Sequence, residues 1–252
     1  MPAINENPNS ASTDSPAVGS QHPNVALLHA MFSGTAETYD AVVSLTTLGM
    51  DRWWKHRLMK AVPEGREYRR ILDLACGTGI STLKIADRFP NAEIVGIDLM
   101  KSYLAVASRK VKKQNRKNVE FIHMPVENLA ELPGEFDLVL GSFAPKLVDL
   151  ERLASSCSAK ISPGGAIVLH DFIVPNALLL RMGFRAYWLL VKSFMRMRAG
   201  WAETSQNLFR IIWESNWQQD LQMVLTGEGF TDFYCETQPL QVARIVRALH
   251  PV

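Results

Sequence analysis

The residues of this sequence best suited to chemistry are two glycines, Gly77 and Gly79, and two carboxylates, Asp73 and Asp98. The glycines follow an apolar stretch, I-L-D-L-A at 71–75, and Asp98 ends a second one, I-V-G-I-D at 94–98. Glycine lets the backbone approach a ligand closely, and a carboxylate at a strand end accepts hydrogen bonds from ribose hydroxyls. The pattern predicts a site for a cofactor that contains adenosine.

The glycine turn also discriminates between classes of cofactor. Nicotinamide dehydrogenases use G-x-G-x-x-G, in which the third glycine allows close helix–strand packing beside a pyrophosphate. Thr82 stands at that third position, so a nicotinamide dehydrogenase is a disfavoured alternative. The run D-x-A-x-G-x-G, which begins at Asp73, resembles instead motif I of the class I S-adenosylmethionine (SAM) methyltransferases.

Two stretches before this motif narrow the resemblance. M-F-S at 31–33 with Y-D at 39–40, and L-G-M-D-R-W-W-K at 48–55, resemble N-terminal patterns of the UbiE-type ubiquinone/menaquinone biosynthesis C-methyltransferases. The resemblance covers residues 30–245. It implies that SAM is the methyl donor and that the methyl group goes to a ring carbon of a quinone or polyprenyl-phenol precursor, an aromatic and hydrophobic small molecule.

The resemblance also implies a SAM site built from strand ends and the loops that follow them. Asp98 is expected on the ribose hydroxyls, although it could instead cap the helix after it. Asp73 is a lone charge in an apolar strand, so we expect it to accept bonds from turn amides or from the SAM ammonium. Pro125 stands where the family has Asp or Asn beside the adenine, which leaves the backbone N–H of Val126 for a ring nitrogen. The expected members are Asp73, Ala75, Gly77, Thr78, Gly79, Asp98, Leu99, Pro125, Val126 and Ser142.

Four residues are candidates for catalysis. His170 and Asp171 end an expected strand, where either could remove a proton or where the two could simply cap the strand. Lys146 stands where the family has an arginine and could lower the pKa of a phenol, without the bidentate fork of a guanidinium. The resemblance implies that Tyr39 faces the SAM methyl group and stabilises the sulfonium; its alternative role is to anchor a helix.

Two departures from the family pattern keep other functions open. The family's F-G-x-R-N is F-A-P-K-L here, at 143–147. This change leaves room for a small-molecule or natural-product methyltransferase that acts at O, N or C. Pro125 leaves room for a SAM-binding protein that does not transfer methyl groups.

The order of apolar and amphipathic segments predicts an α/β fold. Strands are expected at 70–75, 93–98, 119–124, 136–142 and 166–172, with helices at 79–89, 100–115 and 147–160. Such alternation implies a doubly wound, mostly parallel sheet. Segments 230–238 and 241–249 are expected to add an antiparallel hairpin, which completes a seven-stranded, Rossmann-like sheet.

The rest of the chain is expected to form extensions of one methyltransferase domain, 25–252. Residues 1–24 are rich in Asn, Ser, Pro and Ala, which predicts a disordered tail. Residues 25–62 are expected to form N-terminal cap helices over the site, and residues 175–228 a helical lid insertion.

The composition of the chain indicates its cellular compartment and the classes of partner that it is expected to bind. The formal charge of +2 over 252 residues gives no reason to expect a nucleic-acid partner. Three widely spaced cysteines fit a reducing compartment, and no His or Cys spacing predicts a metal site. No apolar stretch reaches the length of a membrane span. We therefore expect a cytoplasmic protein that could lie at the periphery of a membrane and could form a homodimer.

One expected helix, 177–196, carries a basic stripe beside many apolar residues. Its cations Arg181, Arg185, Lys192 and Arg196 fall within an arc of about 60°. The stripe is either the solvated side of a lid helix or the flank of a helix that lies on a membrane surface.

Overall fold

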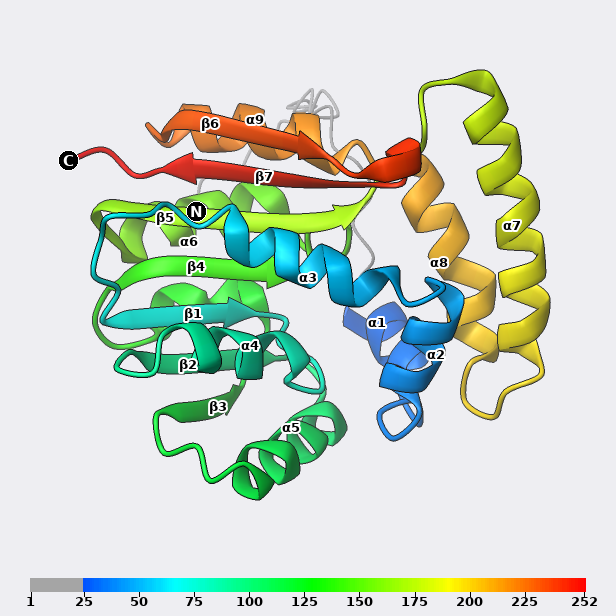
Figure 1. Ribbon diagram of the computed structural model, residues 1–252, viewed down its shortest axis with the longest axis horizontal. Coiled ribbons are helices and arrows are strands. Elements are labelled where there is room, and N and C mark those ends of the chain that lie inside the picture. Colours follow the sequence, from blue (N-terminus) through cyan, green and yellow to red (C-terminus); the bar gives the residue numbers. More distant parts are fainter. Residues whose placement is uncertain (1–24) are drawn as a thin grey trace, which may run out of the picture.

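The computed structural model describes residues 25–252, so the tail expected at 1–24 lies outside the described residues. A single sheet of seven strands runs through the molecule in the order β3-β2-β1-β4-β5-β7-β6 (Figure 1). The strands are β1 Arg70–Leu74, β2 Glu93–Asp98, β3 Val119–His123, β4 Phe136–Ser142, β5 Ile161–Phe172, β6 Thr231–Thr237 and β7 Ala243–Leu249.

The sheet is mixed, because β7 runs antiparallel to both of its neighbours, β5 and β6. The strands from β1 to β5 pair in parallel. The expected α/β class and the mostly parallel sheet are confirmed. The expected hairpin exists, but its second strand β7 enters the sheet between β5 and β6.

Helices cover both faces of the sheet, as an alternating chain requires. On one face lie α3 Met50–Lys60, α4 Ile80–Arg88 and α5 Lys101–Lys113; on the other lie the 3-10 helix η1 Val126–Glu131, α6 Leu150–Lys160 and α9 Trp217–Gly227 (Figure 1). The helix expected at 147–160 begins later, because Pro145–Leu147 form a separate 3-10 turn, η2. The side chain of Asp149 then caps α6 by accepting from the backbone N of Arg152 at 3.1 Å.

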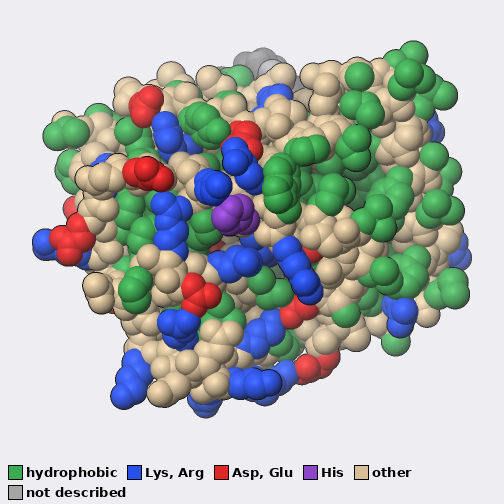
Figure 2. All heavy atoms as spheres, viewed as in Figure 1, with side chains coloured by type: hydrophobic (Ala, Val, Ile, Leu, Met, Phe, Trp, Pro, Cys, Tyr) green, Lys and Arg blue, Asp and Glu red, His purple; other side chains and the backbone are tan. Residues whose placement is uncertain are grey.

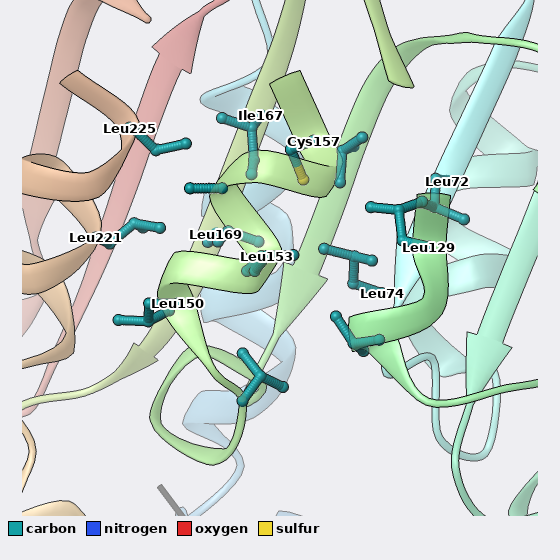
Figure 3. Packing of buried hydrophobic residues seen from close by; sticks show 14 of the residues in the cluster. Leu72, Leu74, Leu129, Leu150, Leu153, Cys157, Ile167, Leu169, Leu221 and Leu225 are labelled. Atoms are coloured by element: carbon teal, nitrogen blue, oxygen red, sulfur yellow. The ribbon is translucent and has the colours of Figure 1, made fainter. Parts of the chain in front are cut away.

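The main core lies between the sheet and the helices α6 and α9. The side chains that meet there are apolar and almost fully buried, and they point toward one another across the layers (Figure 3). They include Leu150, Leu153 and Cys157 of α6, Leu221 and Leu225 of α9, and Ile167 and Leu169 of β5. This packing fixes the strand ends that carry the site.

The carboxyl ends of the parallel strands face a group of helices at one end of the molecule (Figure 1). These helices are α1 Val25–Phe32, α2 Tyr39–Thr46, α7 Leu178–Arg196 and α8 Ala202–Glu214. Of the segment expected as a lid, α9 instead belongs to the layer against the sheet, because Trp217, Leu221 and Leu225 are buried in the main core. Within residues 25–252, no helix is long and apolar enough to cross a membrane.

Candidate active site

The glycine turn between β1 and α4 is tight because its conformation excludes side chains. Gly77 and Gly79 have positive φ angles of 57° and 79°, which favour glycine. A Cβ on Gly79 would lie 2.9 Å from the Cβ of Ala107 on α5. The turn therefore lies directly against α5.

Asp98, at the end of β2, ties this turn to the next loop. Its carboxylate accepts from the backbone N of Gly77 and from the backbone N of Met100, each at 2.8 Å. Burial raises its pKa, and these two amide bonds oppose the rise. The bond to Met100 is not the helix cap that the sequence left open, because Met100 is itself the N-cap of α5 and no side chain caps this helix among the described residues. A carboxylate has further lone pairs, so Asp98 can also accept from a ligand.

Asp73 finds a different partner from the one expected. The hydroxyl of Thr82 donates to its carboxylate at 2.6 Å, so a side chain of α4 and not a turn amide satisfies it. Burial raises the pKa of Asp73 to about 7, and the Thr82 bond opposes the rise. Thr82 thus links α4 to β1 through a hydrogen bond at the position where dinucleotide folds need a bare glycine.

Two hollows open beside the turn and share Ala75, Gly77 and Phe143 in their walls. The first, here called the adenosine hollow, has a volume of about 700 Å³ including its open mouth. Of the expected site residues, it is lined by Asp98, Leu99, Pro125 and Val126, and α1 closes it with Leu28 and Phe32. Its wall is largely apolar and includes two carboxylates, Asp98 and Glu127, a lining of the kind that nucleoside sites have.

The second hollow, here called the methyl hollow, is more polar and has a volume of about 450 Å³ including its mouth. Asp73, Thr78 and Ser142 line it from the sheet side. Tyr39, Asp40, Asp51 and Lys55 line it from the N-terminal helices. Of the expected SAM residues, all but Gly79 line at least one of the two hollows, and Gly79 lets the turn pack against Ala107 of α5.

The two shared wall residues other than glycine are strained. Ala75 and Phe143 have positive φ angles of 47° and 64°, a region that residues with a Cβ rarely adopt and that is enriched at functional sites. A hydrogen bond from the backbone N of Phe143 to the carbonyl of His170 at 2.8 Å holds the strained turn after β4. The Phe143 side chain therefore has a fixed position between the hollows.

Helix α2 is fastened over the turn by Asp40. This carboxylate accepts from the hydroxyl of Thr78 at 2.5 Å and forms an ion pair with Lys110 of α5. Lys110 also donates to the carbonyl of Thr78 at 2.9 Å. Tyr39, next to Asp40, lies between two aromatic rings, with Trp201 stacked at 6.0 Å and Tyr103 edge-on at 5.0 Å. Burial raises the pKa of Tyr39, so its phenol stays protonated.

Asp51 and Lys55 form a buried ion pair that was not singled out from the sequence. Lys55 Nζ lies 3.4 Å from Asp51 Oδ2, and the hydroxyl of Thr47 donates to the other oxygen at 3.3 Å. The Lys55 ammonium also lies 5.2 Å from the centre of the Phe143 ring. Burial lowers the pKa of Lys55, and Asp51 opposes this. The signal was present in L-G-M-D-R-W-W-K, because a spacing of four residues places Asp51 and Lys55 on one helix face.

Three catalytic candidates, His170 and Asp171 of β5 and Lys146 of η2, lie behind Phe143 and line neither hollow. Lys146 and Asp171 form a fully buried ion pair, and the Lys146 ammonium also donates to the Phe143 carbonyl at 3.2 Å. His170 is fully buried and its Nδ1 lies 3.1 Å from the hydroxyl of Ser142. Burial lowers the pKa of His170 to about 3, so its ring is neutral. The catalytic roles expected for these residues stay predictions, and their contacts in the structure are with the Phe143 turn and Ser142.

Comparison with known proteins identifies the family. The model of the ubiE/COQ5 methyltransferase family matches residues 19–246. The chain belongs to this family. Membership confirms the resemblance found in the sequence and with it the enzyme class, a SAM-dependent methyltransferase. Within residues 25–252, no group of three His, Cys, Asp or Glu side chains is placed to hold a metal ion.

Individual members of the ubiE/COQ5 family match the chain at modest identity. A demethylmenaquinone methyltransferase of Thermus thermophilus is 32% identical over 166 residues, which cover 66% of this chain and 74% of that protein. One of Clavibacter sepedonicus is 29% identical over 225 residues, which cover 88% and 89% of the two chains.

A solved structure supports the fold. Phosphoethanolamine N-methyltransferase 2 of Haemonchus contortus, solved with S-adenosylhomocysteine, matches with a TM-score of 0.57 at 17% identity. The match covers 79% of this chain and 52% of that one, so the chain spans about half the length of that structure. At this identity the likeness supports the class I methyltransferase fold.

Proposed function

We propose that this protein transfers the methyl group of SAM to a ring carbon of a quinone or polyprenyl-phenol precursor. The observation that carries the proposal is the methyl hollow, in which the buried Lys55 and Asp51 lie across from the glycine turn. A large apolar groove lies behind the same wall. The relatives named above are demethylmenaquinone methyltransferases, which agrees with an acceptor of this class.

The residues of the two hollows fit the proposed methyl donor. The bare backbone at Gly77 leaves room beside Asp98, where the carboxylate can accept from ribose hydroxyls. Asp73 and Thr78 offer oxygens in the methyl hollow, where the amino acid end of the donor carries its ammonium. When bound, SAM supplies an electrophilic methyl group on a sulfonium. The Tyr39 ring lies at this hollow with its phenol protonated, which suits a cationic neighbour.

The acceptor's apolar part fits the groove between α7 and the loop before α3. This acceptor groove has a volume of about 790 Å³ including its mouth. Its walls are almost entirely apolar and aromatic: Thr46, Thr47, Leu48, Met50, Trp54, Phe172, Leu179, Leu180, Gly183, Phe184, Tyr187, Trp188, Leu240 and Val242. Phe172 stacks on Phe143 with ring centres 5.1 Å apart, and Trp54 meets the same ring edge-on at 6.2 Å. One aromatic wall thus joins the groove to both donor hollows.

Lys55 is the residue that we assign to activation of the acceptor. A ring carbon attacks well only when the adjacent phenol has lost its proton, because the phenolate places negative charge on the ring. An ammonium beside the phenol lowers the phenol's pKa. Lys55 can supply this charge at the methyl hollow, and Asp51 holds it in position. In this proposal Lys146, Asp171 and His170 position the Phe143 turn.

The test is methyl transfer by the purified protein to a demethylated quinol with a short isoprenoid tail. We expect a product that is heavier by one methyl group on carbon, formed together with S-adenosylhomocysteine and identified by mass spectrometry and NMR. Transfer to oxygen would favour the alternative of an O-methyltransferase. Binding of SAM without product from any phenolic acceptor would contradict the proposal.

A homodimer and a peripheral membrane contact remain predictions about the same enzyme.

A further inference from the structure

Helix α7 has two apolar faces, and only one of them is buried. Phe184, Trp188, Val191 and Met195 pack into a core cluster with the N-terminal and β7 segments. At about 100° per residue, a second apolar set lies on the opposite side of the helix. Its members and their exposed fractions are Leu178 70%, Leu179 82%, Met182 61%, Leu189 63% and Leu190 70%. We call this set the outer face of α7.

The apolar surface continues beyond α7 onto the other side of the acceptor groove. Leu48 and Leu240, which line the groove opposite the helix, are 73% and 58% exposed. Figure 2 shows hydrophobic side chains gathered over α7 at the right of the view. Single exposed leucines are ordinary, but a contiguous apolar patch on a protein surface marks an interaction site. The mouth of the groove opens within this patch.

A row of cations borders the outer face. Arg181, Arg185, Lys192 and Arg196 lie between the exposed and the buried faces of α7, all on one side. Helix α7 has no acidic residue, and among residues 25–252 none of the four cations pairs with a carboxylate. A partner that covers the outer face must therefore be apolar where it meets the leucines and anionic where it meets the border.

We propose that the outer face of α7, together with Leu48 and Leu240, docks on the surface of a lipid bilayer that contains anionic lipid. An exposed apolar face flanked by Lys and Arg is the pattern of a helix that lies in the interfacial plane of a bilayer. A second copy of the chain on this face would bring two cationic borders together without a counter-charge. A bilayer with anionic lipid satisfies both, because its acyl region takes up the apolar face and its head groups pair with the cations.

Docking in this orientation turns the mouth of the acceptor groove toward the bilayer. A lipid-soluble acceptor could then pass into the groove without crossing water. This consequence rests on the proposed function, whereas the docking surface itself rests on the exposed side chains of α7 with Leu48 and Leu240. The two ideas therefore fail separately: vesicle binding tests the surface, and methyl transfer to a water-soluble, short-tailed acceptor tests the reaction.

The experiment is co-sedimentation of the protein with phosphatidylcholine vesicles, with and without phosphatidylglycerol. We expect the wild type to bind only the anionic vesicles, and to release them as salt is raised. Leu190→Glu should bind at least about 10-fold more weakly, because it removes a leucine from the buried contact. Met223→Glu is its matched control: Met223 is exposed to the same 70% but lies on α9, and this variant should bind like the wild type.

A second pair of variants tests the cationic border. Lys192→Gln combined with Arg196→Gln should bind anionic vesicles about 30-fold more weakly. The control, Lys112→Gln with Lys113→Gln, removes two exposed cations from α5 and should change binding little. Equal losses in test and control variants would overturn the proposal. So would the absence of vesicle binding by the wild type, or a change of oligomeric state in Leu190→Glu that shows a second copy covering the face.

Discussion

At the scale of single residues, the site contains buried ionisable groups that have few hydrogen-bond or ion-pair partners. The Asp73 carboxylate accepts one hydrogen bond, from a hydroxyl, and each carboxylate oxygen of Asp98 accepts one from a backbone N–H. Lys55 has one carboxylate at 3.4 Å. Burial favours the neutral form of each group, so it raises the pKa of both carboxyl groups and lowers the pKa of Lys55. A charged ligand that enters the hollows can therefore reverse these shifts, so binding and protonation are coupled.

The coupling predicts the pH dependence of stability in the free protein. The folded pKa of Asp73, about 7, lies above its unfolded value of 3.8. The folded state thus binds more protons between these values, and the free energy of unfolding falls as pH rises from about 4 to 7. Asp73→Asn keeps an acceptor for Thr82 and should remove up to about 4 kcal/mol of this fall. Urea unfolding at a series of pH values measures the effect.

The matched control for this variant is Asp232→Asn, because the side chain of Asp232 is 61% exposed. Its stability should follow that of the wild type with pH. A wild-type slope that persists unchanged in Asp73→Asn would show that Asp73 is not the group that titrates.

Lys55→Met tests the proposed activation of the acceptor. Loss of one group that stabilises a developing oxyanion lowers turnover by about 100-fold or more. The deficit should shrink as pH rises, because the acceptor phenol then loses its proton without help. The wild-type rate should in turn fall at alkaline pH, where Lys55, whose pKa burial lowers, loses its charge. The pH profile of turnover with a short-tailed acceptor measures both.

A purely structural role for Lys55 gives a different result, namely an equal deficit at every pH. Lys112→Met serves as the control, because Lys112 is exposed on α5 and lines neither hollow. It should retain wild-type turnover.

At the scale of elements, the contact between the glycine turn and α5 sets the shape of the donor site. Gly79→Ala forces a Cβ to within 2.9 Å of Ala107 and also strains a φ of 79°. Gly65→Ala has the same strain, at φ 77°, but nothing within 4 Å. The control should lose about 1 kcal/mol of unfolding free energy from strain alone. Gly79→Ala should lose more, and should also bind SAM more weakly because α5 and the turn move apart.

Unfolding in urea and calorimetry with SAM separate the two effects. Equal destabilisation of the two variants, with unchanged SAM affinity in Gly79→Ala, would show that α4 and α5 tolerate the extra carbon. The contact between the glycine turn and α5 would then not determine the shape of the donor site.

The sequence predicted the elements better than it predicted the chemistry inside them. Strands and helices alternate with clear apolar patterns, and a glycine turn or a carboxylate at a strand end has one place in such a fold. Which side chain of a strand end faces the ligand depends on packing with distant elements. Thus Asp98 lines a hollow, whereas His170 and Asp171 are buried behind Phe143, and the role of each toward a ligand stays a prediction. Lys55 was missed because it reaches the site from α3, far from motif I in the sequence.

At the scale of the whole molecule, the site lies between two parts of the chain, the sheet with its loops and the N-terminal helices. The end of β2 supplies Asp98, the loops after the strands supply Gly77 and Val126, and α1 supplies Val25 and Phe32 to the same adenosine hollow. Among the described residues, the side-chain hydrogen bond from α2 to the turn comes from one carboxylate, that of Asp40, which also pairs with Lys110 of α5. Tyr39 adds a ring contact to Tyr103 of α5. The N-terminal helices should therefore open and close over the sheet more readily than the sheet's own layers separate.

This arrangement predicts where a bound donor product stabilises the chain. S-adenosylhomocysteine would contact α1 and α2 on one side and the glycine turn on the other, so it should slow amide hydrogen exchange in α1 and α2 as well as in the turn. Helix α9 serves as the internal control, because its buried side chains, such as Leu221, pack in the main core and line neither hollow. Its exchange should stay unchanged at partial saturation. Protection confined to the glycine turn would mean that the N-terminal helices do not close on the ligand, and that the lining by Val25 and Phe32 adds nothing to binding.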